Sequence, residues 1–134
     1  MSTRACIKIK EKVCLNCHDK ELTDCVIILY HHHDGYPSGV GTDLKEYIRD
    51  VVSKWACGWE AEMIATDLVR GAIKDSEGNP DMGYEVAICE HGDCEYGYEI
   101  DCDARTLTCY DLPHGVPKQW RKSWAVEIPD RKAA

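Results

Sequence analysis

Histidine and acidic side chains gather at two places in the chain, and both groups carry the donor atoms that metal sites and proton transfer use. Residues 31–33 are three histidines followed by Asp34, and His91 and Asp93 stand close together further on. In an extended strand, the first and third histidine of the run share one face and the second points to the other. Imidazole and carboxylate ligands suit a catalytic divalent metal. The candidate ligands of such a hydrolytic site are His31, His33, Asp34, His91 and Asp93. The alternative is histidines that pair with carbonyls and carboxylates at a strand end.

A glycine-rich loop follows directly. Residues 35–42 read GYPSGVGT, and we expect Thr42 or Asp43 to cap the helix that begins there. Backbone amides and a helix N-terminus in such a loop can face an anion. The segment lacks the closing Gly-Lys-Ser/Thr of a Walker motif and the G-x-G-x-x-G of dinucleotide-binding folds. The alternative is that the glycines only permit a tight reversal of the chain.

Nine cysteines are present, and Cys14, Cys17 and Cys25 lie close together in the sequence. Residues 14–18 read CLNCH, the attachment signature of c-type haem. That haem is attached outside the cytoplasm, and no export signal precedes the motif. With the neighbouring histidines, the three cysteines are a possible zinc set, although no second C-x-x-C or H-x-H stands at the usual spacing. The alternative is a hairpin loop with reduced thiols, because the odd count disfavours a disulfide framework.

A basic and aromatic cluster stands near the C-terminus of an otherwise acidic chain. Residues 118–124 read KQWRKSW, in which Trp120 and Arg121 suit stacking on a base and pairing with a phosphate. Trp and Arg are also common anchors of interfaces, and docking on a neighbouring subunit is the favoured interpretation. Arg105 stands in a predicted tight turn, where it is either a phosphate ligand or a solvated charge.

The composition and the absence of certain motifs disfavour several classes of function. The net charge is −8 over 134 residues, whereas nucleic-acid-binding proteins usually carry a basic footprint, so we expect no DNA or RNA partner. No apolar run approaches the ~18 residues of a membrane span, and no signal sequence is apparent, so we expect a cytoplasmic protein without a membrane partner. A serine triad is not supported, because Ser38 is not in a G-x-S-x-G turn.

Hydrophobic periodicity predicts the elements that position these groups. Residues 4–13 alternate between apolar and polar side chains, and residues 25–32 form a continuous apolar run, so we expect two strands. Apolar side chains at helical spacing predict one helix from Thr42 or Asp43 to a stop at Gly58, and a second over residues 60–74. Three further strands are expected, joined by short turns into an antiparallel meander. Their predicted ranges are 84–89, 95–102 and 107–110.

This order, β-β-α-α-β-β-β, predicts an α+β fold with an antiparallel sheet of about five strands and two helices on one face. We expect residues 1–112 to form a single domain. Residues 113–134 are expected to be an arm or a short strand that packs on the domain or on a neighbouring subunit.

Three segments together resemble small phage and prophage proteins that carry an H-x-D-G-Y-P block before a helix. These segments are residues 3–9, residues 30–37 (YHHHDGYP) and residues 91–101. Within that group the chain looks most like the Thoeris anti-defence sponges. The resemblance implies a non-enzymatic protein that binds a cyclic ADP-ribose isomer made by a host TIR enzyme. It also implies a homo-oligomer with ligands near subunit boundaries, and some of these sponges bind cyclic oligonucleotides.

Our leading hypothesis is therefore a ligand sponge without a catalytic centre, cofactor or bound metal. A phosphorylated nucleotide ring needs cations or amides for phosphate, an aromatic ring for the base, and an acid or histidine for ribose hydroxyls. The predicted ligand-binding residues are Asp34, Tyr36, Thr42, His91, Arg105, Trp120 and Arg121. Two alternatives are a metal-dependent hydrolase built on the histidine and aspartate groups, and an inhibitor that binds a host enzyme through its acidic surface.

Overall fold

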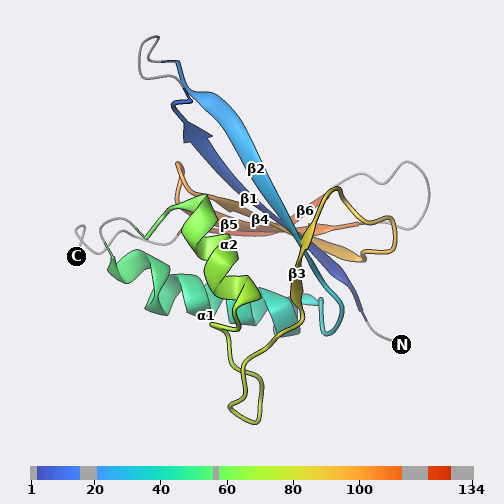
Figure 1. Cartoon of the computed structure of the whole chain (residues 1–134). Coiled ribbons are helices and arrows are strands. Elements are labelled where there is room, and N and C mark those ends of the chain that lie inside the picture. The colour runs from blue at the N-terminus through green and yellow to red at the C-terminus, as the bar shows by residue number, and fades with distance from the viewer. Residues whose placement is uncertain (1–2, 16–20, 56–57, 113–120, 128–134) are drawn as a thin grey trace.

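The protein forms one six-stranded sheet with two α-helices (Figure 1). The structure is a computed structural model, and it describes residues 3–15, 21–55, 58–112 and 121–127. The elements, in chain order, are β1 (Ala5–Val13), β2 (Thr23–His31), a π-helical turn (Pro37–Gly41), α1 (Thr42–Asp50), a 3-10 turn (Val52–Lys54), α2 (Ala61–Val69), β3 (Tyr84–Ala87), β4 (Tyr96–Asp101), β5 (Thr106–Asp111) and β6 (Arg121–Glu127).

The strand order across the sheet is β3-β2-β1-β4-β5-β6. Four of the five neighbouring pairs are antiparallel, and the central pair, β1 with β4, is parallel. Ala5, at the start of β1, lies opposite His31 on one side and Tyr96 on the other. The α+β class is therefore confirmed, whereas the predicted antiparallel sheet of about five strands differs from the observed sheet, which has six strands and one parallel pair. The sixth strand comes from the predicted C-terminal arm, of which residues 121–127 pair with β5.

The predicted meander is confirmed for β4 and β5, which pair antiparallel across a short turn, but it is wrong for β3, because β3 and β4 are not neighbours. β3 pairs with β2 at one edge of the sheet, and β4 lies on the far side of β1. The chain between them crosses the sheet, and Cys94 in this connection is buried against Cys6 and Tyr30. The backbone amide of Glu95 then donates to the carbonyl of Arg4, which aligns β4 with β1. Residues 88–93 of the connection are exposed, so it is the burial of Cys94, together with this hydrogen bond, that fixes the crossing in place of the expected hairpin turn.

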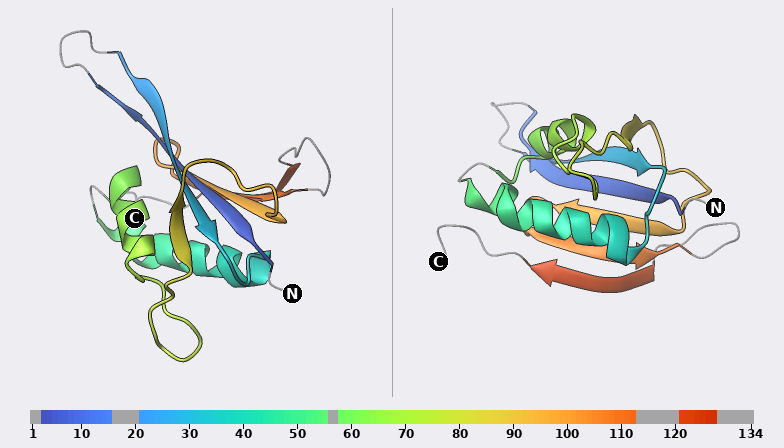
Figure 2. Two further views of the ribbon diagram at one scale, coloured as in Figure 1. Left: turned by 45° about the vertical axis from the view of Figure 1, so that its right-hand side comes forward. Right: turned by 90° about the horizontal axis from the view of Figure 1, so that it is seen from below.

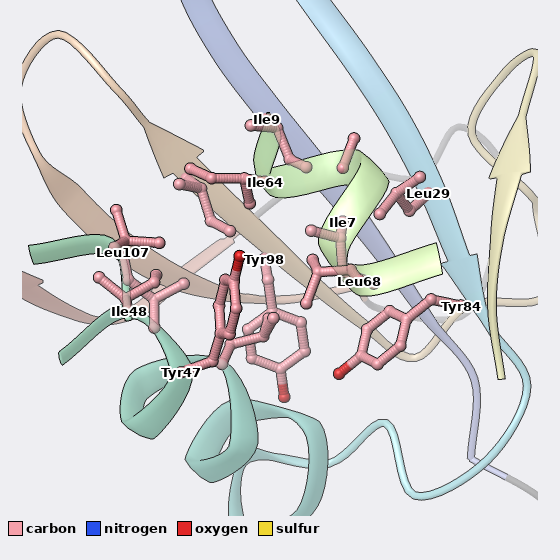
Figure 3. Close-up of a cluster of buried hydrophobic side chains, with 14 of the residues drawn as sticks. Ile7, Ile9, Leu29, Tyr47, Ile48, Ile64, Leu68, Tyr84, Tyr98 and Leu107 are labelled. Atoms are coloured by element: carbon pink, nitrogen blue, oxygen red, sulfur yellow. The ribbon is translucent and has the colours of Figure 1, made fainter. Parts of the chain in front are cut away.

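Both helices cover the same face of the sheet, as predicted (Figure 2). Alternate residues of β1 point to the helices, and Ile7 and Ile9 have no exposed surface. Their partners in the core include Tyr98 from β4, Ile48 from α1 and Leu68 from α2 (Figure 3). α2 contacts β1, β2 and β3, so α1 is left to cover the β4 and β5 side.

The helices are shorter than the periodicity predicted. α1 ends at Asp50, and a 3-10 turn, Val52–Lys54, follows it. α2 ends at Val69 and not at residue 74, because Gly71 adopts a φ of 84°, which reverses the chain.

Candidate ligand-binding site

A pocket of about 380 Å³ opens between the N-terminal end of α1 and the edge strand β6. Five described residues line it, and they are Pro37, Gly41, Thr42, Lys45 and Trp124. The Trp124 side chain is half-buried, and its ring centroid lies 6.4 Å from that of Tyr98 in the core. The Thr42 hydroxyl donates to the carbonyl of Pro37 at 3.2 Å, so its oxygen still has lone pairs that can accept a hydrogen bond. The pocket is thus formed by the glycine-rich loop, the start of α1 and the C-terminal strand β6.

The glycine-rich loop folds into a π-helical turn that runs directly into α1. The carbonyl of Asp34 accepts from Val40 at 2.8 Å, and the carbonyl of Tyr36 accepts from Gly39 at 2.9 Å. A Cβ atom at Gly39 would overlap the carbonyl oxygen of Asp34, so no larger residue fits there. Gly41 allows the close approach of β6, because its missing side chain leaves room for Trp124.

Two predictions for this loop are therefore corrected. Gly41, with helical dihedral angles, precedes α1, so neither Thr42 nor Asp43 caps the helix with its side chain. The amides of Gly39 and Val40 are already bonded within the turn, so they do not face an anion. The glycines instead permit the tight reversal, as the alternative interpretation held.

The chemistry of the pocket differs from that of the protein as a whole. Lys45 supplies a positive charge, Trp124 supplies an aromatic face, and Thr42 supplies a hydroxyl. No acidic residue is among the five described lining residues, although the chain carries a net charge of −8. The local field in a cleft depends on the charges that line it, so this pocket suits an anionic ligand.

Asp34 and Tyr36 belong to the same loop as the pocket and bond to each other. The Tyr36 hydroxyl donates to the Asp34 carboxylate at 2.9 Å, and this bond raises the pKa of Tyr36 above its ordinary value. Asp34 has a φ of 51°, in the left-handed region that aspartate tolerates. Tyr36 keeps 39% of its surface exposed, but neither Tyr36 nor Asp34 is among the described residues that line the pocket.

The other predicted phosphate ligands are not brought together. Arg105 lies in the turn between β4 and β5, at the end of the sheet where Lys10 pairs with Asp101. The glycine-rich loop lies at the opposite end, about 17 Å away along β1 at ~3.3 Å per residue. Arg121 begins β6 opposite Asp111, at the same end as the loop. Trp120 lies outside the described residues.

His31 and His91, one from each predicted histidine group, lie on opposite faces of the sheet, whereas the His32 ring packs on Tyr30, as that of His91 does. His31 points to the helix side, and only 3% of its surface is exposed. Its Nε2 lies 2.8 Å from the carboxylate of Asp81, and its Nδ1 accepts from the backbone amide of His33 at 3.3 Å. Both ring nitrogens are therefore occupied in the folded chain, which matches a histidine held at a strand end.

His91 packs on the other face, where its ring centroid lies 4.2 Å from that of Tyr30. The Tyr30 hydroxyl donates to Asp93 at 3.0 Å, and burial together with this bond raises the pKa of Tyr30 to about 12. Within the described ranges, no three His, Cys, Asp or Glu side chains come close enough to hold a metal ion. The five histidine and aspartate ligands considered for a hydrolytic site thus do not converge. The possible zinc set includes Cys17, which lies outside the described residues.

Lys45 is the pocket residue that the sequence analysis missed. It follows Thr42 by three positions, and helical residues at that spacing share a face, so the signal was present in the predicted helix. Trp124 was recognised within the basic and aromatic cluster, but its position over the glycine-rich loop depends on β6 joining the sheet beside β5.

Comparison of the chain with protein-family models, curated proteins and solved structures found no match. In the part of the chain that the structure describes, neither helix has the length and apolar character needed to cross a membrane.

Proposed function

We propose that the chain is a non-enzymatic binding protein that takes up a cyclic nucleotide between α1 and β6 and withholds it from another protein. The observation that supports this function is the meeting of Trp124, Thr42 and Lys45 around one pocket. These residues come from two segments that are far apart in the sequence. Each offers a group that a phosphorylated nucleotide requires.

The pocket matches such a ligand in size and in chemistry. Its volume of about 380 Å³ lies in the range of ~300–1,000 Å³ that is usual for small-molecule sites. The Trp124 ring can stack on a base, with Pro37 forming an apolar wall, and the Lys45 ammonium can pair with a phosphate. The Thr42 hydroxyl can meet a ribose hydroxyl. Binding needs no further reactive group.

The ligand class and the biological setting rest on the resemblance to Thoeris anti-defence sponges. On that basis we propose a cyclic ADP-ribose isomer or a cyclic oligonucleotide as the ligand. The site of action would be the cytoplasm of a phage-infected host cell. Asp34 and Tyr36 remain proposed ligand-binding residues, because they stand next to the pocket in the same loop.

A thermal-melt screen of the full chain tests the function. The probes are cyclic ADP-ribose isomers and cyclic di- and trinucleotides, each with and without EDTA, followed by mass spectrometry of the ligand. A ligand at 100 times its Kd adds about 2.7 kcal/mol to the free energy of unfolding, which raises Tm by several degrees. We expect such a shift to survive EDTA, with the ligand recovered intact. A ligand recovered cleaved, or no shift with any nucleotide, would contradict the proposal.

Matched variants test the site. Trp124→Ala should weaken binding by about tenfold or more, because stacking of a base on an aromatic ring is worth ~1–3 kcal/mol. Lys45→Met should weaken binding and reduce its dependence on salt. The controls are Trp55→Ala and Lys74→Met, at residues that do not line this pocket. If the controls and the pocket variants lose affinity equally, the ligand binds elsewhere.

One further observation favours the inhibitor as a second candidate. Asp43, Glu46 and Asp50 line a groove of about 270 Å³ along α1, in which Lys74 is the one cation among the described lining residues. Such an acidic stripe suits a basic surface on a protein partner. This function predicts a complex that weakens as salt rises and that is lost in Glu46→Lys, with no nucleotide effect on Tm.

A further inference from the structure

The outer edge of β3 is an unprotected strand edge. β3 ends the strand order, and β2 is its one neighbour in the described sheet. Val86 in this strand is 69% exposed, and Ile88, directly after it, is 99% exposed. Proteins usually guard such edges with charged residues or proline. Glu85 is the one charged residue of β3, and it bonds His32 on the opposite face at 2.9 Å.

A groove of about 340 Å³ runs between this edge and α2. Its floor is apolar and includes Ile27, Val69 and Val86. Glu62 lies toward one end and Arg70 toward the other, with Thr66 between them on the same side of the helix. Within the described residues, neither Glu62 nor Arg70 forms an ion pair. We name this surface, formed by β3 and the lining residues of α2, the β3–α2 face.

The direction of α2 is set by contacts at its two ends. The amide of Ala61 donates at 2.7 Å to Glu11, near the end of β1. Beyond the helix, the carbonyl of Ile73 accepts at 2.8 Å from Asp81, which holds His31 at the end of β2. Because β1 and β2 are antiparallel, α2 runs in the direction of β2 and antiparallel to β3.

The midpoint between the two charged residues lies in the groove that Val86 also lines. Thr66 stands halfway between Glu62 and Arg70, about 6 Å from each at ~1.5 Å per helical residue. Val86 lines the same groove as Thr66 and lies about 7 Å from the strand positions two residues before and after it. A two-fold axis perpendicular to the sheet at this point therefore brings Glu62 of each copy toward Arg70 of the other.

We infer that the β3–α2 face binds the same face of a second copy of the chain. The two β3 strands pair antiparallel with Val86 opposite Val86, which joins the two sheets into one and covers both exposed edges. A second copy suits this face better than an unrelated peptide. The two-fold axis places Glu62 of each copy beside Arg70 of the other, so the charges of the two faces are complementary. The pocket beside β6 stays at the outer edges of the dimer, so the inference stands apart from the proposed function.

The test measures the assembly state of the full chain by sedimentation velocity at micromolar concentration. We expect a dimer for the wild type and a monomer for Val86→Lys, which places two like charges at the centre of the interface. Glu62→Arg and Arg70→Glu should each weaken the dimer, and the double exchange should restore it. Mixing the two single variants should give a heterodimer, since each then meets opposite charges, and native mass spectrometry identifies it. Glu77→Arg in the exposed turn before β3 is the matched control.

Each possible result either supports or overturns the proposed dimer. A monomeric wild type at this concentration overturns it. A dimer that survives all of the substitutions overturns it as well, because the contact then lies on another surface. Circular dichroism of each variant separates a lost interface from a lost fold, and the heterodimer can form only from folded chains. Rescue by mixing supports the two-fold pairing directly.

Discussion

Trp124 lies directly over Gly41: a Cβ atom at Gly41 would stand 3.3 Å from Cζ2 of the Trp124 ring. The same atom would lie 3.2 Å from Cε1 of Tyr98. Gly41 has helical dihedral angles, so its backbone alone would accept any residue. The close approach of β6 to α1, which forms the proposed ligand pocket, therefore depends on the missing side chain.

Gly41→Val should displace Trp124 and destabilise the protein. Overpacking of this kind costs about 1–3 kcal/mol. Urea unfolding gives the free energy, and the emission maximum of tryptophan fluorescence reports the altered surroundings of the ring. Gly92→Val is the matched control, because a Cβ atom there has no neighbour within 4 Å among the described residues. Equal unfolding midpoints for the two variants would show that the contact at Gly41 does not limit packing.

Tyr84→Phe should leave the protein as stable as before or more stable by about 1 kcal/mol. The Tyr84 hydroxyl is buried and has no hydrogen-bond partner among the described residues (Figure 3). Removing an unsatisfied buried polar group relieves its desolvation cost. Tyr98→Phe should instead lose about 1 kcal/mol, because the Tyr98 hydroxyl donates to the carbonyl of Gly35 at 2.6 Å. If the urea midpoint moved in the same direction for both variants, the contrast between an unpaired Tyr84 hydroxyl and a hydrogen-bonded Tyr98 hydroxyl would be contradicted.

Glu11→Ala should destabilise α2. The Glu11 carboxylate, from β1, accepts from the amide of Ala61 at the first turn of α2 at 2.7 Å. Loss of such a helix cap costs about 0.5–2 kcal/mol. Glu11→Gln keeps an acceptor oxygen and should lose less, and Lys12→Ala on the exposed neighbour should be nearly neutral. Chemical denaturation ranks the three variants, and an unchanged midpoint for Glu11→Ala would exclude the cap.

Asp43→Asn should raise the urea midpoint near neutral pH. Burial, and then the nearby Asp81 and Glu46 carboxylates, raise the pKa of Asp43 above its ordinary value of 3.8. The folded chain thus holds the proton more tightly than the unfolded chain, so stability falls as pH rises through the raised pKa. Below 3.8, Asp43 is protonated in both states, and the difference between Asn and Asp should vanish.

Asp50→Asn is the control, for which we expect the opposite change in the urea midpoint. Its hydrogen bonds with Arg49 lower the pKa of Asp50, so the ionised group favours the folded state above 3.8. Asp50→Asn should therefore lower the midpoint near neutral pH. If the urea midpoint moved in the same direction in both variants, general charge repulsion, and not the surroundings of Asp43, would explain the change in stability.

Thiol labelling should divide the cysteines by burial. Burial raises the pKa of Cys6 to about 12, that of Cys102 to about 12 and that of Cys109 to about 11, so few of these thiols ionise near pH 8. Iodoacetamide should modify the exposed Cys14 and Cys89 in the native protein and reach the buried thiols after unfolding. Peptide mass spectrometry reads the sites. Fast native labelling of Cys102 would show that the core opens readily.

Local patterns in the sequence were enough to predict most elements. The alternation in β1 and the apolar run in β2 gave the correct strands, because side-chain direction follows a period of two along any strand. The helices were found from their apolar stripes. Their ends were less well predicted, because Gly71 reverses the chain through a backbone conformation that periodicity does not reveal.

Strand neighbours and the meeting of distant residues were decided by tertiary structure. A short connection rich in turn residues favoured a hairpin after β3, yet burial of Cys94 against Cys6 and Tyr30 directs the chain across the sheet and places β4 parallel to β1. The same ordering puts β6 beside β5, which brings Trp124 to the loop before α1.

The separation of His31 from His91 has the same cause. Both histidines were recognised from their chemistry, but the face to which each points depends on the register of β2 and on the path of the connection after β3. The residue types that a site can use are therefore determined by the sequence alone. Which of them meet depends on contacts between segments far apart in the chain, because burial of apolar surface acts between segments and is not encoded in any single one.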